Sequence, residues 1–201
     1  MGKGNQTRAL IIERSAPLFN KQGYAGTALS DLMKATGLEK GGIYRHFASK
    51  EELAAEAFDF AWAAAVRVRA RGVEDEENAV DRLKLMVANF VELRAGLVPG
   101  GCPLLNTAIE ADDGNAVLRE RARRALHDWQ SLLTRIARQG LKSGEIRKDV
   151  KPEELAGLII AQLEGALMIS RIERSDAALR QVQAHLNRYI DMELAASTFT
   201  G

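Results

Sequence analysis

Side chains able to bind nucleic acid gather in one short stretch, TALSDLMKATGLEKGGIYRHFASK, which runs from Thr27 to Lys50. Its ammonium, guanidinium, imidazole and phenol groups are the kinds that donate hydrogen bonds to phosphates and base edges. The surrounding pattern indicates two short helices joined by a glycine-containing turn, which presents one helix end to the major groove of DNA. The candidate contacts are Thr27, Lys40, Gly41, Gly42, Tyr44, Arg45, His46 and Lys50.

The contacts expected from the second short helix differ in kind. Gly41 and Gly42 lie in its first turn, where the lack of a side chain lets the backbone approach DNA closely. Tyr44 offers a ring and a hydroxyl at the edge of the groove, and Arg45 can read guanine or bind phosphate. His46 can donate to a phosphate or simply pack against its neighbours.

Three further residues are expected to contact the DNA backbone. Thr27 is the expected N-cap of a helix over 28–36, and Lys50 opens a long helix, so both lie where backbone N–H groups already favour a phosphate. Lys40 is a candidate phosphate contact as well. The alternative for both lysines is a solvated side chain with no partner.

The elements that must position these groups are predicted to be helices throughout. Only 4 Pro and 5% aromatic residues accompany a hydrophobic content of 46%, which is typical of a mostly helical protein with a substantial core. Ser49 and Glu52 form a capping box, and Gly37 supplies the positive φ of a helix end. Apart from a loop over 96–101, we expect about nine helices, at roughly 6–22, 28–36, 40–47, 50–71, 76–95, 103–111, 115–141, 152–171 and 176–196.

Charge and composition restrict the setting. Residues 1–50 hold eight basic side chains against three acidic ones, whereas the whole chain has a net charge of only +1. A basic N-terminal head is the layout of a protein that meets a polyanion at one end. The single Cys excludes an intrachain disulfide and suits the cytoplasm. No apolar run approaches the roughly 18 residues of a membrane span, so no membrane is expected as a partner.

The last two predicted helices indicate a homodimer. The segment after Pro152, PEELAGLIIAQLEGALMISR, is apolar nearly all the way round and needs cover on two sides. The final helix carries one apolar seam, and two such helices suit a four-helix interface between copies. The expected interface comprises Leu155, Leu158, Ile159, Gln162, Leu163, Ala166, Leu179, Val182, Leu186 and Ile190. The alternative is burial inside the chain's own bundle.

Large apolar side chains in the body could surround a small molecule, and such a lining favours one that is itself apolar or aromatic. The candidate ligand-binding residues are Phe58, Trp62, Met86, Phe90, Cys102, Trp129 and Met168. Each of the six large side chains could equally belong to the core.

Cys102 precedes Pro103 at an expected helix start, where the helix dipole lowers a thiol pKa. It is therefore either a sensing thiol or a structural residue. The acidic cluster Glu110, Asp112 and Asp113 is interpreted as a solvated helix end rather than a metal site, and no metal or other cofactor is expected.

The head resembles the TetR (tetracycline-repressor-type) family of bacterial transcriptional regulators. The resemblance is carried by Leu18-Phe19, Gly23-Tyr24, Thr27, LMKATGLEKGGIYRHF at 32–47 and SKEEL at 49–53, with GGCPLLNTAIEADD at 100–113 similar to one subgroup. It implies a three-helix DNA-binding head at 1–49 and a helical ligand-binding and dimerisation body at 50–201. Family members often carry a hydroxyl residue in place of Gly42 and a polar base contact in place of Ala28.

Taken together, these features predict a cytoplasmic, homodimeric repressor that a small molecule releases from an inverted-repeat operator on double-stranded DNA. The open alternatives are an activator or architectural protein without a ligand, and a helical enzyme. An enzyme is disfavoured because no nucleophile–base motif, phosphate loop or metal-ligand spacing is present, and the three His are scattered. No catalytic residue is expected.

Overall fold

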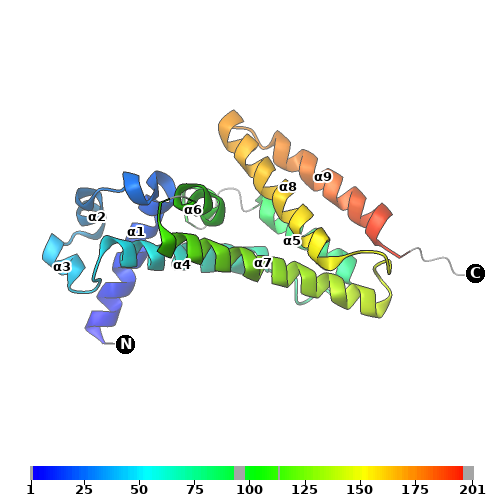
Figure 1. The fold of residues 1–201 in the computed structure, drawn as a ribbon, viewed down its shortest axis with the longest axis horizontal. Coiled ribbons are helices and arrows are strands. Elements are labelled where there is room, and N and C mark those ends of the chain that lie inside the picture. The colour runs from blue at the N-terminus through cyan, green and yellow to red at the C-terminus, as the bar shows by residue number, and fades with distance from the viewer. Residues whose placement is uncertain (1, 93–97, 113, 197–201) are drawn as a thin grey trace, which may run out of the picture. The chain divides into compact units, whose positions relative to one another are not determined.

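The computed structural model describes residues 2–92, 98–112 and 114–196, and this part of the chain is all-α, with nine helices (Figure 1). The expected loop at 96–101 and the expected helix end at Ala95 lie partly outside these residues. The helices are α1 (Lys3–Gly26), α2 (Leu29–Thr36), α3 (Lys40–Tyr44), α4 (Lys50–Arg69), α5 (Ala79–Glu92), α6 (Pro103–Ala111), α7 (Ala116–Ser143), α8 (Pro152–Glu173) and α9 (Ala177–Tyr189), and a π-helical turn, Ile190–Leu194, follows α9.

Helix boundaries follow local capping groups. Helix α5 starts three residues later than expected because Asn78 caps it, its Oδ1 accepting from the Val80 N–H at 2.8 Å. Helix α2 ends at Gly37, whose φ of 71° is the predicted left-handed cap. Helix α3 ends at Tyr44 rather than Phe47, so the predicted reading helix is shorter than expected.

The chain forms two compact units. Unit 1 comprises Met1–Val66 and Ala95–Ala125, and unit 2 comprises Arg67–Arg94 and Leu126–Gly201. Helices α4 and α7 each continue from one unit into the other. Unit 1 therefore contains α6 and the start of α7 as well as the predicted head, whereas the functional division at residues 49 and 50 stays a prediction.

The core of unit 1 holds the helix-turn-helix together. Ile11 from α1, Leu32 from α2 and Ile43 from α3 are each at most 1% exposed and form one cluster with Phe47 and Leu53. Helix α3 has only five residues and is too short to be stable alone, so this packing holds it in place.

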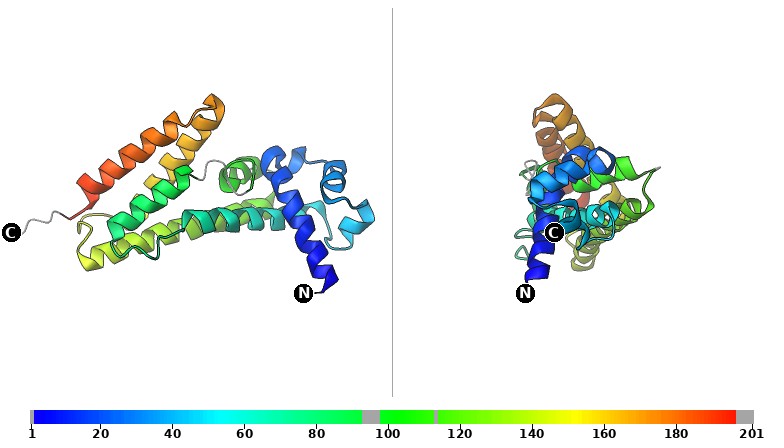
Figure 2. Two further views of the ribbon diagram at one scale, coloured as in Figure 1. Left: turned by 180° about the vertical axis from the view of Figure 1, so that it is seen from behind. Right: turned by 90° about the vertical axis from the view of Figure 1, so that its left-hand side faces the viewer.

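Unit 2 is built around α5, α8 and α9, with the second part of α7. Figure 2 shows α8 and α9 side by side, and both also pack against α5. The core residues Leu83, Ile159 and Leu186 are at most 1% exposed. An isolated antiparallel bridge between Ile146 and Ala195 joins the α7–α8 connection to the residues after α9.

Helix α8 corrects one sequence expectation. Its 18-residue window of highest hydropathy averages 1.5, so by length and composition alone it could cross a membrane, although no such run was expected. Within that window 44% of the residues are buried inside the chain. Because core helices of soluble proteins meet the same criterion, the composition of α8 is weak support for a membrane span.

Candidate nucleic-acid interface and effector core

One face of the predicted reading helix packs into the core of unit 1, and the other is exposed. Ile43 is 1% exposed and Phe47 is 2% exposed, so the two apolar side chains of this segment point into unit 1. Lys40, Gly41 and Arg45 are exposed. A Cβ placed on Gly41 would meet no atom within 4 Å, so the chain leaves open space in front of this backbone.

The remaining predicted contacts on this segment are half-buried. Gly42 packs near Leu38, whose Cβ would lie 3.4 Å from a Cβ at position 42. Tyr44 and His46 keep part of their side chains accessible. The structure therefore brings Lys40 to His46 together on one short segment, whose buried positions, Ile43 and Phe47, are four residues apart.

Thr27 occupies a different position from the one predicted. It is fully buried, and its hydroxyl donates to the Gly23 carbonyl at 2.6 Å. The N-cap of α2 is Ala28, whose own N–H donates to Asp31 Oδ2 at 3.2 Å, so the expectation that Thr27 caps α2 is wrong. The Thr27 backbone N–H also donates to the Gly23 carbonyl, at 3.2 Å, so neither the side chain nor the backbone of this residue is accessible to a phosphate in this structure.

Lys50 is half-buried at the start of α4, and its Nζ lies 4.5 Å from the centroid of the Tyr24 ring. A cation over an aromatic face is stabilised by the ring quadrupole. This contact orients the Lys50 ammonium relative to α1 before any phosphate is bound.

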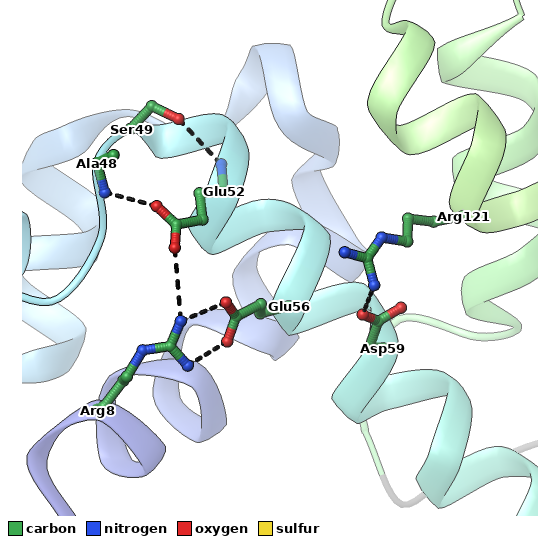
Figure 3. Close-up of polar contacts among 7 residues, drawn as sticks. All are labelled: Arg8, Ala48, Ser49, Glu52, Glu56, Asp59 and Arg121. Carbon is green, nitrogen blue, oxygen red and sulfur yellow. Dashed lines mark hydrogen bonds and ion pairs between the residues drawn. The ribbon is translucent and has the colours of Figure 1, made fainter. Parts of the chain in front are cut away.

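A network of charged groups joins α1 to the start of α4 (Figure 3). The Arg8 guanidinium donates to both carboxylate oxygens of Glu56 and lies 3.5 Å from a Glu52 oxygen. Hydrogen bonding to Glu56 raises the pKa of Arg8 above its usual value. Ser49 Oγ accepts from the Glu52 N–H at 3.1 Å, which confirms the Ser49 half of the predicted capping box, whereas the Glu52 carboxylate accepts from the Ala48 N–H at 2.6 Å, one residue before the cap.

A second ion pair within unit 1 joins α4 to α7, because the Arg121 guanidinium donates to Asp59 (Figure 3). Burial nevertheless raises the pKa of the Asp59 carboxyl above its usual value, and this effect exceeds the opposing ones of Arg121 and Arg124.

Sequence reasoning missed the role of Glu110 at the end of α6. Its two carboxylate oxygens accept from the N–H groups of Tyr24 and Ala25 at 2.7 and 2.8 Å. Glu110 and Asp112 are both exposed, as expected of a solvated helix end, but the Glu110 carboxylate also holds the end of α1; Asp113 lies outside the described residues. Among the described residues, no group of three or more His, Cys, Asp or Glu could hold a metal ion.

The predicted ligand-binding residues are distributed over both units. In unit 2, Met86, Phe90 and Trp129 are buried, and the rings of Phe90 and Trp129 stack with centroids 5.6 Å apart. In unit 1, Phe58, Trp62 and Cys102 are buried, with Cys102 at the N-cap of α6. Met168 is 46% exposed on α8, so it lies outside the buried set.

A buried charge pair accompanies the aromatic rings of unit 2, and no sequence signal marked it. Arg69, only 4% exposed, lies 4.8 and 4.3 Å from the ring centroids of Phe90 and Trp129. Its guanidinium is also 4.0 Å from the Glu164 carboxylate on α8. Arg and Glu are seldom buried without such partners, so the two rings and the ion pair account for the burial of both charges. We refer to Arg69, Phe90, Trp129 and Glu164 as the aromatic–charge cluster.

The predicted interface residues separate into two sets. Most point into unit 2, where Leu155, Ile159, Leu163, Ala166, Leu179, Leu186 and Ile190 are at most 5% exposed. Gln162 and Val182 are half-buried. On the opposite face of α8, Leu158, Met168, Ile169 and Ile172 are 41, 46, 48 and 72% exposed. These four residues lie at helical spacing and form an apolar stripe, which we call the outer stripe of α8.

The fold and this surface define a helix-turn-helix DNA-binding protein. The family described as "Bacterial regulatory proteins, tetR family" matches residues 11–57, and "Tetracyclin repressor-like, C-terminal domain" matches residues 79–186. The chain belongs to the TetR family of transcriptional regulators, as its sequence predicted. It is a ligand-responsive DNA-binding regulator, a class of protein that is generally not enzymatic.

Solved structures and curated relatives of this family are similar to the protein over most of its length. A TetR transcriptional regulator from Chloroflexus aurantiacus J-10-fl is 44% identical, with a TM-score of 0.94 over 98% of this chain and 100% of that one. A TetR-family regulator from Cytophaga hutchinsonii is 37% identical, with a TM-score of 0.89 over 95% and 96% of the two chains. The HTH-type transcriptional repressor DhaR of Mycobacterium sp. (strain GP1) is 29% identical over 87% of each chain.

Proposed function

We propose that the protein is a cytoplasmic, homodimeric repressor that leaves an inverted-repeat operator when a small molecule binds. The observation that carries this proposal is the arrangement of α3, where Ile43 and Phe47 anchor the segment while Lys40 and Arg45 are exposed. A mildly basic surface with an open glycine backbone suits the major groove. The name of DhaR, a transcriptional repressor, supports repression over activation.

The DNA contacts fall into two groups. We assign base reading to Arg45 and Tyr44, and phosphate binding to Lys40 and His46, in addition to a close backbone approach at Gly41 and Gly42. Lys50 would bind a phosphate beside the reading helix, whereas Thr27 is buried and is not part of the proposed contact surface. Glu39, exposed before α3, opposes these contacts because it would repel a nearby phosphate.

The outer stripe of α8 is the proposed centre of the dimer interface. An exposed apolar stripe on an already buried helix needs a second partner, and a second copy of the chain supplies one with the same surface. Ala161 and Gly165 are interspersed on this face, and a Cβ at Gly165 would meet no atom of the chain within 4 Å. The small residues would let the partner's helix approach closely. The half-buried Gln162 and Val182 would form its margin.

The aromatic–charge cluster is the proposed effector site in unit 2, together with Met86. Its rings suit an apolar or aromatic small molecule, and the Arg69–Glu164 pair would add a polar contact that fixes its orientation. Phe58, Trp62 and Cys102 stay candidates from unit 1. Met168 is assigned to the dimer interface instead, since it is 46% exposed on the outer stripe.

The switch would act through α4. This helix begins beside the reading helix at Lys50 and ends at Arg69, one residue of the proposed effector site. Two reading helices bind successive major grooves only when they are about 34 Å apart. An effector that favours another spacing must bind that state about 10⁴-fold better, or about 5.5 kcal/mol, to release the operator almost completely.

The decisive experiment is operator selection followed by substitution. A preferred duplex would be selected from a random library with the purified protein, and its affinity measured for the wild type and for Tyr44→Ala/Arg45→Ala. The double variant should lose at least a hundredfold in operator affinity while remaining a dimer. Lys148→Ala, which removes an exposed charge between α7 and α8, is the matched control and should bind as the wild type does. Equal affinity of all three proteins would refute the assignment of α3.

Effector binding can be followed by intrinsic fluorescence, because the chain has only two tryptophans. In a Trp62→Phe variant the remaining emission comes from Trp129. An aromatic effector in the aromatic–charge cluster should change that emission at the concentration that releases the operator. Release without any change in Trp129 emission would place the effector elsewhere.

A further inference from the structure

The end of α1 is held by side chains of α6, a segment some 80 residues further along the chain. Gly23 has φ 75° and ψ 173°, which interrupts the helical backbone just before Tyr24 and Ala25. The Glu110 carboxylate accepts from both of these N–H groups, at 2.7 and 2.8 Å. A Cβ on Gly23 would lie 2.6 Å from Glu110 Oε2, so the glycine gives the carboxylate the room that it needs.

A second contact lies one turn earlier on both helices. Asn106 Nδ2 donates to the Asn20 carbonyl at 2.9 Å and to its side-chain oxygen at 3.0 Å. Asn20 Nδ2 in turn donates to the carbonyls of Pro99 and Gly101, at 3.2 and 3.1 Å, in the segment that leads into α6. Asn20 is 8% exposed, so these bonds are largely shielded from water and costly to break.

We propose that Glu110, supported by Asn106, is a positioning residue for DNA reading. These two side chains and the α1 backbone that they hold are here called the α6 latch. The inference rests on the DNA-binding function proposed above. The latch fixes the turn from which Thr27 bonds back to Gly23, and α2 begins two residues after Thr27. The direction in which the helix-turn-helix leaves α1 is therefore set by α6.

The latch also gives the reading head a second link to the rest of the chain. Helix α7 follows α6 and continues into unit 2, so the reading head is joined to unit 2 through α6 and α7 as well as through α4. A rearrangement that moved α6 would withdraw hydrogen-bond acceptors from Tyr24 and Ala25 and so release the head from its DNA-reading orientation.

The direction in which DNA affinity changes when a carboxylate is removed distinguishes a positioning role from electrostatic repulsion of DNA. Removing a carboxylate from a DNA-binding unit should strengthen binding to any duplex, since less negative charge then faces the phosphates. The latch predicts the reverse for Glu110. Asp112, exposed two residues away on the same helix end, is the matched control because its carboxylate makes no hydrogen bond or ion pair with another described residue.

The experiment compares wild type with Glu110→Ala, Glu110→Gln and Asp112→Ala, using the selected operator duplex and a random duplex of equal length. We expect Glu110→Ala to bind the operator about tenfold more weakly, as the loss of two charge-assisted hydrogen bonds implies, and the random duplex no more weakly than wild type. Glu110→Gln keeps one acceptor oxygen and should be intermediate. Asp112→Ala should bind both duplexes at least as tightly as wild type.

Two results would overturn the latch. One is equal operator affinity for Glu110→Ala and Asp112→Ala. The other is a proportional loss on both duplexes, which would mean that Glu110 only maintains the fold. If wild type itself prefers no duplex, the proposed function fails first. Hydrogen exchange at the Tyr24 and Ala25 amides, expected to be faster in Glu110→Ala, would then still report whether the contact exists in solution.

Discussion

Arg8 on α1 and Glu56 on α4 form a two-point ion pair, 48 residues apart in sequence. The same guanidinium lies 4.6 Å from the centroid of the Phe47 ring, whose side chain is in the core of the head. One side chain thus joins the first helix, the end of the reading segment and the start of the long α4 helix. It fixes the place where the reading head meets the helix proposed to transmit the signal.

Loss of this contact should weaken the head measurably. Arg8→Ala should lower the free energy of unfolding by about 1 kcal/mol, since the pair is partly exposed but bidentate and adds a cation–π contact. Arg8→Lys should keep part of that stability but lose the two-point geometry. Urea denaturation measures both. Arg180→Ala, which breaks a local pair between the exposed Arg180 side chain and Asp176, the N-cap of α9, should cost less than half as much, and an equal cost would contradict the role given to Arg8.

The two faces of α8 should respond differently to a charge. Ile169→Glu, on the outer stripe, should give a folded monomer, because the side chain is 48% exposed within one chain. Leu163→Glu should instead unfold unit 2, since Leu163 is 1% exposed and the introduced carboxylate would be buried. Size-exclusion chromatography and circular dichroism separate the two outcomes. A dimeric Ile169→Glu protein would exclude the outer stripe as the interface.

Removing one partner of the buried Arg69–Glu164 pair should destabilise the protein more than removing both. Glu164→Gln leaves the Arg69 charge buried and should lower stability by about 3 kcal/mol. Arg69→Leu/Glu164→Leu removes both charges and should recover much of the loss. Thermal unfolding of the two variants tests this directly. A double variant less stable than Glu164→Gln would show that the pair itself is strongly stabilising.

Asp59 should make stability depend on pH in an unusual direction. Its pKa is raised in the folded chain, mainly by burial, so the folded state binds this proton more tightly than the unfolded state. Its contribution to stability therefore increases as the pH falls through the folded pKa, and it is complete below the unfolded value of about 3.9. Compared with Asp59→Asn, wild type should gain stability between neutral pH and about pH 4. A constant difference would contradict the raised pKa.

Glycine inside a helix usually costs stability, but Gly140 in α7 should be an exception. A Cβ at this position would lie 2.7 Å from Ile146 and 2.8 Å from Ala79. Gly140→Ala should thus destabilise the protein, by about 1–3 kcal/mol from overpacking. Gly157→Ala in α8 is the control, because its Cβ would meet no atom of the chain within 4 Å, and it should leave the subunit as stable or more so. The melting temperature should fall for Gly140→Ala and stay the same or rise for Gly157→Ala.

Much of the head could be predicted because its signals are local. The left-handed cap at Gly37, the capping box at Ser49 and Glu52, and the proline start of α6 each depend on a few adjacent residues. The all-α fold and the family were also predicted from local signals, namely helical periodicity and a motif contained within short stretches, and both predictions were confirmed. The helix ends that were missed, such as the start of α5, depend on caps that were not recognised.

Contacts between segments distant in the sequence could not be predicted from it. The role of the exposed Glu110 was missed because its partners are backbone N–H groups some 85 positions earlier, and a backbone group leaves no signature in a sequence. Arg69 and Glu164 were passed over for a similar reason, since each is an ordinary charged residue on a helix until the fold buries them together.

The sequence by itself therefore determined the class of protein and the helical fold, and it indicated the segment proposed to face DNA, because these follow from spacing and side-chain type along a few turns. The tertiary structure alone decided that Thr27 is buried, that the outer stripe of α8 is separate from its core face, and that α6 holds the end of α1. Burial and hydrogen bonding between remote segments depend on how helices pack, and packing direction is not encoded in any one of them.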